Sequence, residues 1–165
     1  MTRTLILTRH AKSSWDEPTL SDHDRPLNKR GRCSAPAVSG WLLRNGWLPN
    51  EVLSSTALRT RETWDRMGLQ ADLIQFERSL YLAGPDLMMR ALSQASGQTV
   101  LMLGHNPGIA EFARQLVRQA PDHGRFDDYP TCATTVIQFE INSWAALRWH
   151  SGDVLGFVIP RELPE

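Results

Sequence analysis

The sequence TLILTRH, residues 4–10, is an apolar run that ends in Arg9 and His10. Its length and composition predict a short buried strand in the centre of a sheet. In open α/β sheets, ligands bind just outside the carboxyl ends of the strands. Arg9 brings a planar fork of donors suited to phosphate, and His10 brings an imidazole that acts as nucleophile or proton carrier near neutral pH. The pair therefore predicts a ligand site at the end of the first strand.

The composition is that of an ordinary globular protein. The 165 residues are enough for one domain, residues 1–165, with a sizeable core. The 18 basic residues balance the 18 acidic ones, so no overall field favours nucleic acid or an anionic membrane. No apolar stretch is long enough to span a bilayer or to act as a signal peptide, so we expect a cytoplasmic protein. Cys33 and Cys132 lie far apart and form no disulfide framework.

Strand and helix patterns alternate along the chain. Strands are predicted at residues 3–8, 51–53, 71–76, 99–103, 134–139, 145–150 and 154–159. Helices are predicted at residues 29–44, 56–67, 85–95 and 107–119. Pro36 either kinks the first helix or marks its true start. Alternating units of this kind predict an α/β fold: a three-layer α/β/α sandwich with a mostly parallel central sheet.

A second junction of strand and helix carries Arg59. We expect Ser55 or Thr56 to cap the helix, which places Arg59 in its first turn. A basic residue there opposes the helix dipole, and a bound anion removes the conflict. The alternative is a surface arginine that reaches into water.

A third junction carries His105. An apolar strand ends in Gly104 and His105, after which we expect Asn106 to cap and Pro107 to start the next helix. A lone histidine is more often structural, but this is the second histidine at such a junction.

Two segments of the first loop each have a functional and a structural interpretation. Arg25, in the segment 24–27, can fold back over the end of the first strand, although by itself the segment is a turn. The cluster Asp22-His23-Asp24 follows no apolar strand, and we interpret it as a solvated turn.

Taken together, the motifs resemble the histidine phosphatase superfamily, also called the phosphoglycerate mutase-like group. The matching segments are Arg9-His10-Ala11, Ser55-x-x-x-Arg59-x-x-x-Thr63 and Gly104-His105-Asn106. The resemblance implies the phosphoglycerate mutase-like fold. Arg25-Pro26-Leu27 and the segment 129–133 look most like the SixA-type phosphohistidine phosphatases of that group.

The resemblance also implies a two-step reaction. His10 takes up the phosphoryl group, while Arg9, Arg25, Arg59 and His105 hold its oxygens, and water then cleaves the phosphohistidine. Arginines supply the positive charge, so no metal or other cofactor is expected. Glu77 matches the position of the general acid in many relatives; the alternative is a solvated carboxylate. Ala11 replaces the usual glycine, which tightens the backbone approach to the ligand.

The interval from Tyr81 to Val100 is short and lacks the longer insertion of the mutases and sugar bisphosphatases. An open pocket favours a phosphorylated protein as partner, such as a histidine-phosphotransfer domain, over a small phosphate ester. Two alternatives stay open: a small-molecule phosphomonoesterase of the same superfamily, and a non-catalytic module that binds phosphate without using His10. A cysteine phosphatase is excluded, because neither cysteine has an arginine six positions later. The P-loop signature is also missing.

Overall fold

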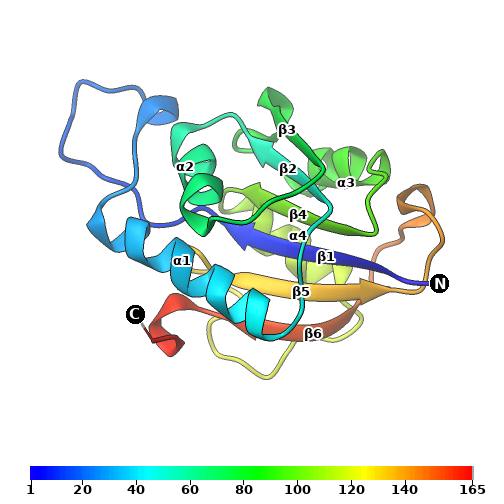
Figure 1. Ribbon diagram of the computed structural model, residues 1–165. Coiled ribbons are helices and arrows are strands. Elements are labelled where there is room, and N and C mark those ends of the chain that lie inside the picture. The colour runs from blue at the N-terminus through cyan, green and yellow to red at the C-terminus, as the bar shows by residue number, and fades with distance from the viewer. Residues whose placement is uncertain (165) are drawn as a thin grey trace.

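A six-stranded sheet runs through the middle of the computed structural model, which describes residues 1–164. The strands lie in the order β3-β2-β4-β1-β5-β6 (Figure 1). Their bounds are β1 Arg3–Arg9, β2 Glu51–Ser55, β3 Leu73–Glu77, β4 Thr99–Gly104, β5 Thr134–Phe139 and β6 Asp153–Val158. The four strands from β3 to β1 are parallel, whereas β5 is antiparallel to both of its neighbours. The sheet is therefore mostly parallel, as predicted.

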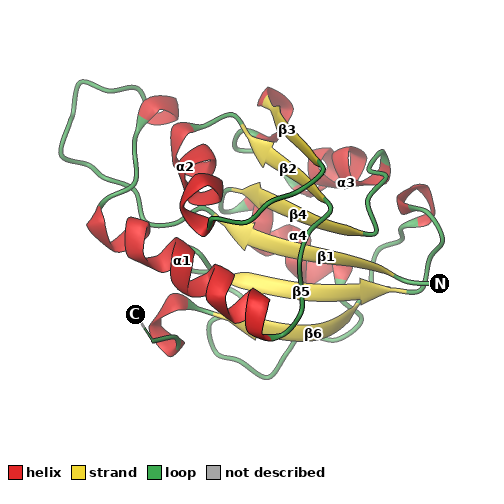
Figure 2. Cartoon of the chain, in the orientation of Figure 1, coloured by secondary structure: helices red, strands yellow, loops and turns green. Residues whose placement is uncertain are grey.

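Helices cover both faces of the sheet. They are α1 (Lys29–Arg44), α2 (Leu58–Met67), α3 (Pro85–Ser93) and α4 (Gly108–Leu116). Helices α1 and α2 lie on one face, and α3 and α4 lie on the other (Figures 1 and 2). This arrangement confirms the three-layer sandwich and matches the phosphoglycerate mutase-like fold.

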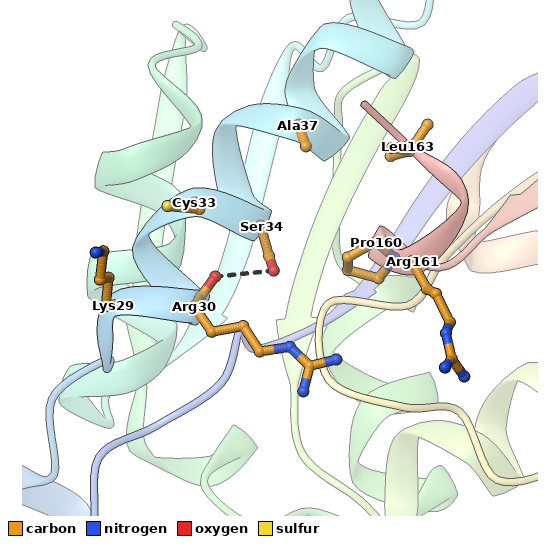
Figure 3. A pocket seen from close by; sticks show the side chains of 8 residues that line it. All are labelled: Lys29, Arg30, Cys33, Ser34, Ala37, Pro160, Arg161 and Leu163. Carbon is orange, nitrogen blue, oxygen red and sulfur yellow. Dashed lines mark hydrogen bonds between the residues drawn. The ribbon is translucent and has the colours of Figure 1, made fainter. Parts of the chain in front are cut away.

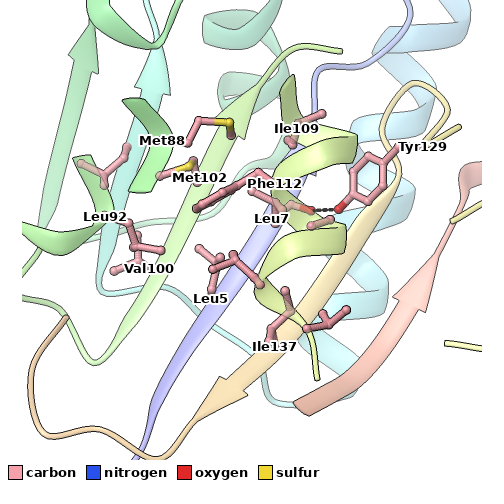
Figure 4. Packing of buried hydrophobic residues seen from close by; sticks show 14 of the residues in the cluster. Leu5, Leu7, Met88, Leu92, Val100, Met102, Ile109, Phe112, Tyr129 and Ile137 are labelled. Atoms are coloured by element: carbon pink, nitrogen blue, oxygen red, sulfur yellow. Dashed lines mark hydrogen bonds between the residues drawn. The ribbon is translucent and has the colours of Figure 1, made fainter. Parts of the chain in front are cut away.

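Strand β1 is buried on both faces because its side chains alternate between the two layers. Leu5 and Leu7 join the core that includes Phe112 of α4 (Figure 4). Ile6 points the other way and packs with Val38 of α1. Full burial of each such side chain contributes about 1.5–3 kcal/mol, which explains why the strand is a continuous apolar run. The strand that ends in Arg9 is thus firmly held.

The predicted strand at residues 145–150 is wrong. Trp144–Ala146 instead forms a 3-10 helix, in which the buried Trp144 side chain donates a hydrogen bond to the carbonyl of Gly97 at 2.6 Å. His150 has a φ of 57°, which no strand residue adopts. Burial of the tryptophan has outweighed the local preference for a strand.

The predicted helix at 107–119 ends early, at Leu116. Val117 forms a parallel bridge with Gly152, and the N–H of Arg118 donates to the Gly152 carbonyl at 2.7 Å. Pairing with the segment before β6 therefore ends the helix.

Two predicted helix caps are also wrong. Helix α2 starts after Ala57, whose N–H donates to the Ser55 hydroxyl at 3.1 Å, so Ser55 organises the turn from outside the helix. The Asn106 amide donates to the carbonyl of Tyr129 at 3.0 Å and caps nothing. Helix α1 does start at Lys29 and runs through Pro36.

The two thiols are free, with Cys33 exposed and Cys132 buried. Within residues 1–164, no helix is both long enough and apolar enough to cross a membrane.

Candidate active site

A cavity of about 420 Å³ opens at the carboxyl ends of β1 and β4. Its lining residues are Arg9, His10, Lys12, Ser13, Trp15, Asp22, Arg25, Arg59, Leu82, His105, Asn106 and Thr131. Five of the six residues predicted for the site are among them. Because β1 and β4 are adjacent and parallel, the residues that follow them meet, and the rings of His10 and His105 lie 5.3 Å apart between centroids.

His10 is held as one tautomer. Its Nδ1 lies 2.7 Å from the carbonyl oxygen of Ala11, and a carbonyl only accepts, so Nδ1 carries the proton. The Nε2 lone pair then has no hydrogen-bond partner among residues 1–164. Burial lowers the pKa of His10 well below its ordinary value; the bond to Ala11 opposes this, and the charge of Arg9 adds to it. His10 is therefore a neutral imidazole near pH 7, with Nε2 available to attack.

His105 is also neutral, but both of its nitrogens are engaged. Arg59 Nη2 donates to Nδ1 at 3.2 Å, because a guanidinium has no acceptor, so Nε2 carries the proton and donates to the Ser55 hydroxyl at 2.8 Å. Burial, followed by the charge of Arg59, lowers the pKa of His105 to about 3. In this arrangement His105 orients Arg59.

Arg59 and Arg25 converge on one carboxylate, that of Asp22. Arg59 Nη2 donates to Oδ2 at 3.0 Å and Arg25 Nη1 donates to Oδ1 at 2.8 Å, while the Tyr81 hydroxyl also donates to Oδ2. Partial burial raises the pKa of Asp22, but the bonds from Tyr81 and Arg59 and the charges of both arginines outweigh it and lower the pKa to about 2. A permanent anion thus bridges the two arginines.

Residues 22–24 form an exposed turn, as interpreted, but the pairing of Asp22 with both arginines was not predicted. The segment forms a short 3-10 turn, and Arg59 also binds the Asp22 carbonyl at 2.7 Å. The spacing of Asp22 and Arg25, three residues apart, is the one signal in the sequence that indicates their pairing.

Arg9 is half-buried and incompletely paired. Its Nη1 donates to the Tyr129 carbonyl at 3.2 Å, whereas its Nε is buried and has no partner within the described chain. Burial and the nearby charge of Arg59 lower the pKa of Arg9, although a guanidinium stays protonated at neutral pH. A buried donor without a partner is costly, and a bound anion beside His10 satisfies it.

The first loop supplies cavity residues that the sequence analysis missed. The Trp15 side chain is 71% exposed, and its ring centroid lies 3.4 Å from Cζ of Arg25. The Ser13 hydroxyl accepts a hydrogen bond from Arg25 Nη2. No periodic pattern distinguishes these residues from other polar loop positions, so only their contacts identify them.

Glu77 is the one predicted site residue that the structure does not bring to the cavity. It ends β3, where it pairs in register with Ser55 of β2. Its role as an acid stays a prediction. Within residues 1–164, no group of three or more histidine, cysteine, aspartate or glutamate side chains is placed to hold a metal ion.

The two lowered histidine pKa values predict a pH-dependent stability. As pH falls below 6.5, the unfolded chain gains a proton on His105 that the folded chain, with a pKa of about 3, does not bind. The free energy of unfolding should therefore fall by about 2 kcal/mol between pH 6.5 and pH 5 from His105 alone. Urea denaturation at pH 6.5 and at pH 5 measures this change in the free energy of unfolding. His105→Gln should flatten this dependence, and equal slopes in the variant and the parent chain would contradict the assignment.

Comparisons with known proteins agree with this geometry. Residues 5–80 match the model of the histidine phosphatase superfamily (branch 1). A solved structure named "Putative Phosphohistidine Phosphatase SixA", from Nakamurella multipartitia, superimposes with a TM-score of 0.81 at 30% identity, over 97% of each chain. The chain belongs to the histidine phosphatase superfamily. The resemblance seen in its motifs is thereby confirmed, and family and fold together support a phosphatase activity.

Relatives of this histidine phosphatase occur in distant organisms. An uncharacterised chloroplast protein of Arabidopsis thaliana is 39% identical over 87% of this chain and 70% of its own length. An uncharacterised protein of Mycobacterium leprae is 33% identical over 93% of this chain and 99% of its own length. Both matches cover more of the chain than residues 5–80, so the likeness extends beyond the segment that the family model matches.

Proposed function

We propose that this chain is a phosphohistidine phosphatase that acts on a phosphorylated protein through a covalent intermediate on His10. The observation that carries the proposal is the neutral His10 ring, whose free Nε2 lines a cavity together with Arg9, Arg25 and Arg59. A nucleophile among fixed cationic donors is the arrangement that phosphoryl transfer requires.

In the first step, Nε2 of His10 attacks phosphorus in line. The Nε2–P bond forms as the bond from phosphorus to the substrate imidazole breaks, and the departing imidazole nitrogen takes a proton from solvent. The Nδ1–H of His10 keeps its bond to the Ala11 carbonyl, which stabilises the positive charge that develops on the ring. Arg9, with its unpaired Nε, offsets negative charge on the phosphoryl oxygens.

In the second step, water attacks phosphorus and the Nε2–P bond breaks. Inorganic phosphate leaves, the proton of water passes to phosphate or solvent, and His10 returns as a neutral imidazole. We propose that the arginines supply the positive charge throughout, without a metal or other cofactor. Imidazole as the leaving group needs less proton assistance than an alkoxide, so Glu77 is not required for this substrate.

The open mouth of the cavity supports a protein substrate. Only the 3-10 turn Arg78–Leu80 and helix α3 occupy the interval before β4. Trp15 and Leu82 line the cavity and are 71% and 55% exposed. The 30% identical neighbour named for phosphohistidine phosphatase activity supports the same substrate class. A histidine-phosphotransfer domain is the kind of partner that fits.

A substrate panel tests the proposal. We expect kcat/KM for a phosphohistidine protein to exceed that for sugar phosphates by about a hundredfold or more, because the open cavity gives small esters few contacts. Activity should persist in EDTA. Faster turnover of sugar phosphates would favour the small-molecule phosphomonoesterase instead, and loss of activity in EDTA would overturn the metal-free step.

A further inference from the structure

A second and larger cavity, of about 640 Å³, lies between the first turns of α1 and the C-terminal segment (Figure 3). Its lining residues are Lys29, Arg30, Cys33, Ser34, Ala37, Pro160, Arg161 and Leu163. The side chains of Arg30 and Arg161 extend from opposite walls, one from α1 and one from the 3-10 turn Pro160–Glu162 (Figure 3). We call this cavity the basic groove.

The basic groove carries unbalanced positive charge. It is lined by three basic residues and by no acidic one among residues 1–164. None of the three forms an ion pair within that range, whereas Arg114, Arg118 and Arg125 elsewhere on the surface each pair with an aspartate. The nearby Glu162 pairs with His123 and is not part of the lining. In a chain with zero formal net charge, the groove is therefore a local patch of positive charge.

The basic groove lies near the candidate active site, with a small cavity between them. A small cavity of about 70 Å³ shares Arg30, Ser34 and Arg161 with the groove and is also lined by Thr131. Thr131 in turn lines the cavity that contains His10. The groove and the His10 cavity are therefore linked by neighbouring lining residues on one side of the molecule.

We propose that the basic groove binds an acidic segment of the phosphorylated protein substrate, next to the phosphorylated residue. This rests on the proposed function and names the recognition surface that goes with it. An extended chain advances about 3.3 Å per residue, so a few residues beside the phosphorylated one reach along the groove. A small phosphate compound would occupy the active-site cavity alone, whereas a chain of linked residues can also contact the neighbouring groove. Acidic side chains on that segment complement Lys29, Arg30 and Arg161.

Matched peptides test the groove. Two phosphohistidine peptides would be compared, one flanked on both sides by aspartate and glutamate, the other by asparagine and glutamine. We expect kcat/KM for the acidic peptide to be about tenfold higher at low ionic strength, with most of the difference in KM, and to lose this advantage as salt is added.

The variant that removes the groove charge is R30E combined with R161E. Both side chains are exposed and form no side-chain hydrogen bond or ion pair within residues 1–164, so the fold should be unaffected. We expect kcat/KM for the acidic peptide to fall at least about tenfold, with that for the neutral peptide unchanged. Arg90→Glu combined with Arg148→Glu, at two exposed positions outside the groove, is the control for the same change in overall charge.

Binding is measured separately from turnover, by fluorescence anisotropy of the same labelled peptides without phosphate. Equal Kd values for both peptides would overturn the groove proposal. Equal effects of the control pair, Arg90→Glu with Arg148→Glu, and of R30E with R161E would overturn it too. Stronger competition by single-stranded DNA than by polyglutamate would assign the groove to nucleic acid and overturn it as well. Phosphohistidine peptides could be inert while phosphoserine peptides show the same preference for acidic flanking residues. That result would support the groove proposal and contradict phosphohistidine as the substrate.

Discussion

Replacing His10 with alanine is expected to lower kcat by about four orders of magnitude. The variant loses the only group in the cavity that combines a neutral ring, a fixed tautomer and a free nitrogen. His105, the other imidazole, has both nitrogens bound to Ser55 and Arg59 and does not replace it. The arginines remain, so binding of a phosphate-shaped oxyanion such as vanadate should survive while turnover does not.

Two measurements test this expectation. Rapid quenching with a labelled phosphohistidine donor should trap an acid-labile phosphoryl group on the parent chain and none on His10→Ala. His123→Ala is the matched control, because His123 pairs with Glu162 and lies outside the cavity. Unchanged turnover in His10→Ala would assign the reaction to another nucleophile. No turnover and no label on the parent chain would favour a phosphate-binding module over an enzyme.

Arg59→Ala should have the second largest effect, a loss of about a thousandfold in kcat/KM. The Arg59 side chain lies between His105 and Asp22 and is almost fully buried, with 4% exposed. The substitution removes the guanidinium that is proposed to stabilise the negative charge of the phosphoryl oxygens. It also leaves Nδ1 of His105 without its donor, so the site loses both charge and order.

The variant Arg59→Lys separates these two contributions. Lysine restores the charge but not the fork, so we expect a loss of about a hundredfold, between those of the parent chain and alanine. Arg61→Ala is the control, since Arg61 is exposed in the same helix and stacks over Phe76 at 4.3 Å. A change of less than about threefold in Arg59→Ala would contradict a role in phosphate binding.

The site was largely predictable because strand ends are marked in the sequence. Arg9-His10 and Gly104-His105 both follow buried apolar runs, and parallel strands bring their carboxyl ends to one edge. Glu77 follows a strand by the same rule, but β3 is the outer strand. It is three strand spacings from β1, about 14 Å along the sheet, so the same pattern leads away from the cavity.

Two of the partners of Asp22 were not predictable, because they are distant in the chain. Arg59 and Tyr81 lie 37 and 59 residues away, and no local periodicity encodes contacts of that kind. Trp15 and Ser13 were missed for a related reason: their loop has no repeat, and its path is set by contacts such as that between Ser13 and Arg25. The conformation of such loop segments is determined by tertiary contacts. The conformation of a strand like β1 follows from the strand preference of its own residues.

The position of β1 in the sheet also sets the order in which the molecule assembles. Leu5 pairs with Val100 on one side and with Ile137 on the other, so β1 is synthesised well before either neighbouring strand and has no partner in the sheet until β4 has been made. Contacts between such distant residues form slowly, because a long loop must close first. His10 meets His105 and Thr131 only after that closure, so an incomplete nascent chain holds the proposed nucleophile but not the complete cavity around it.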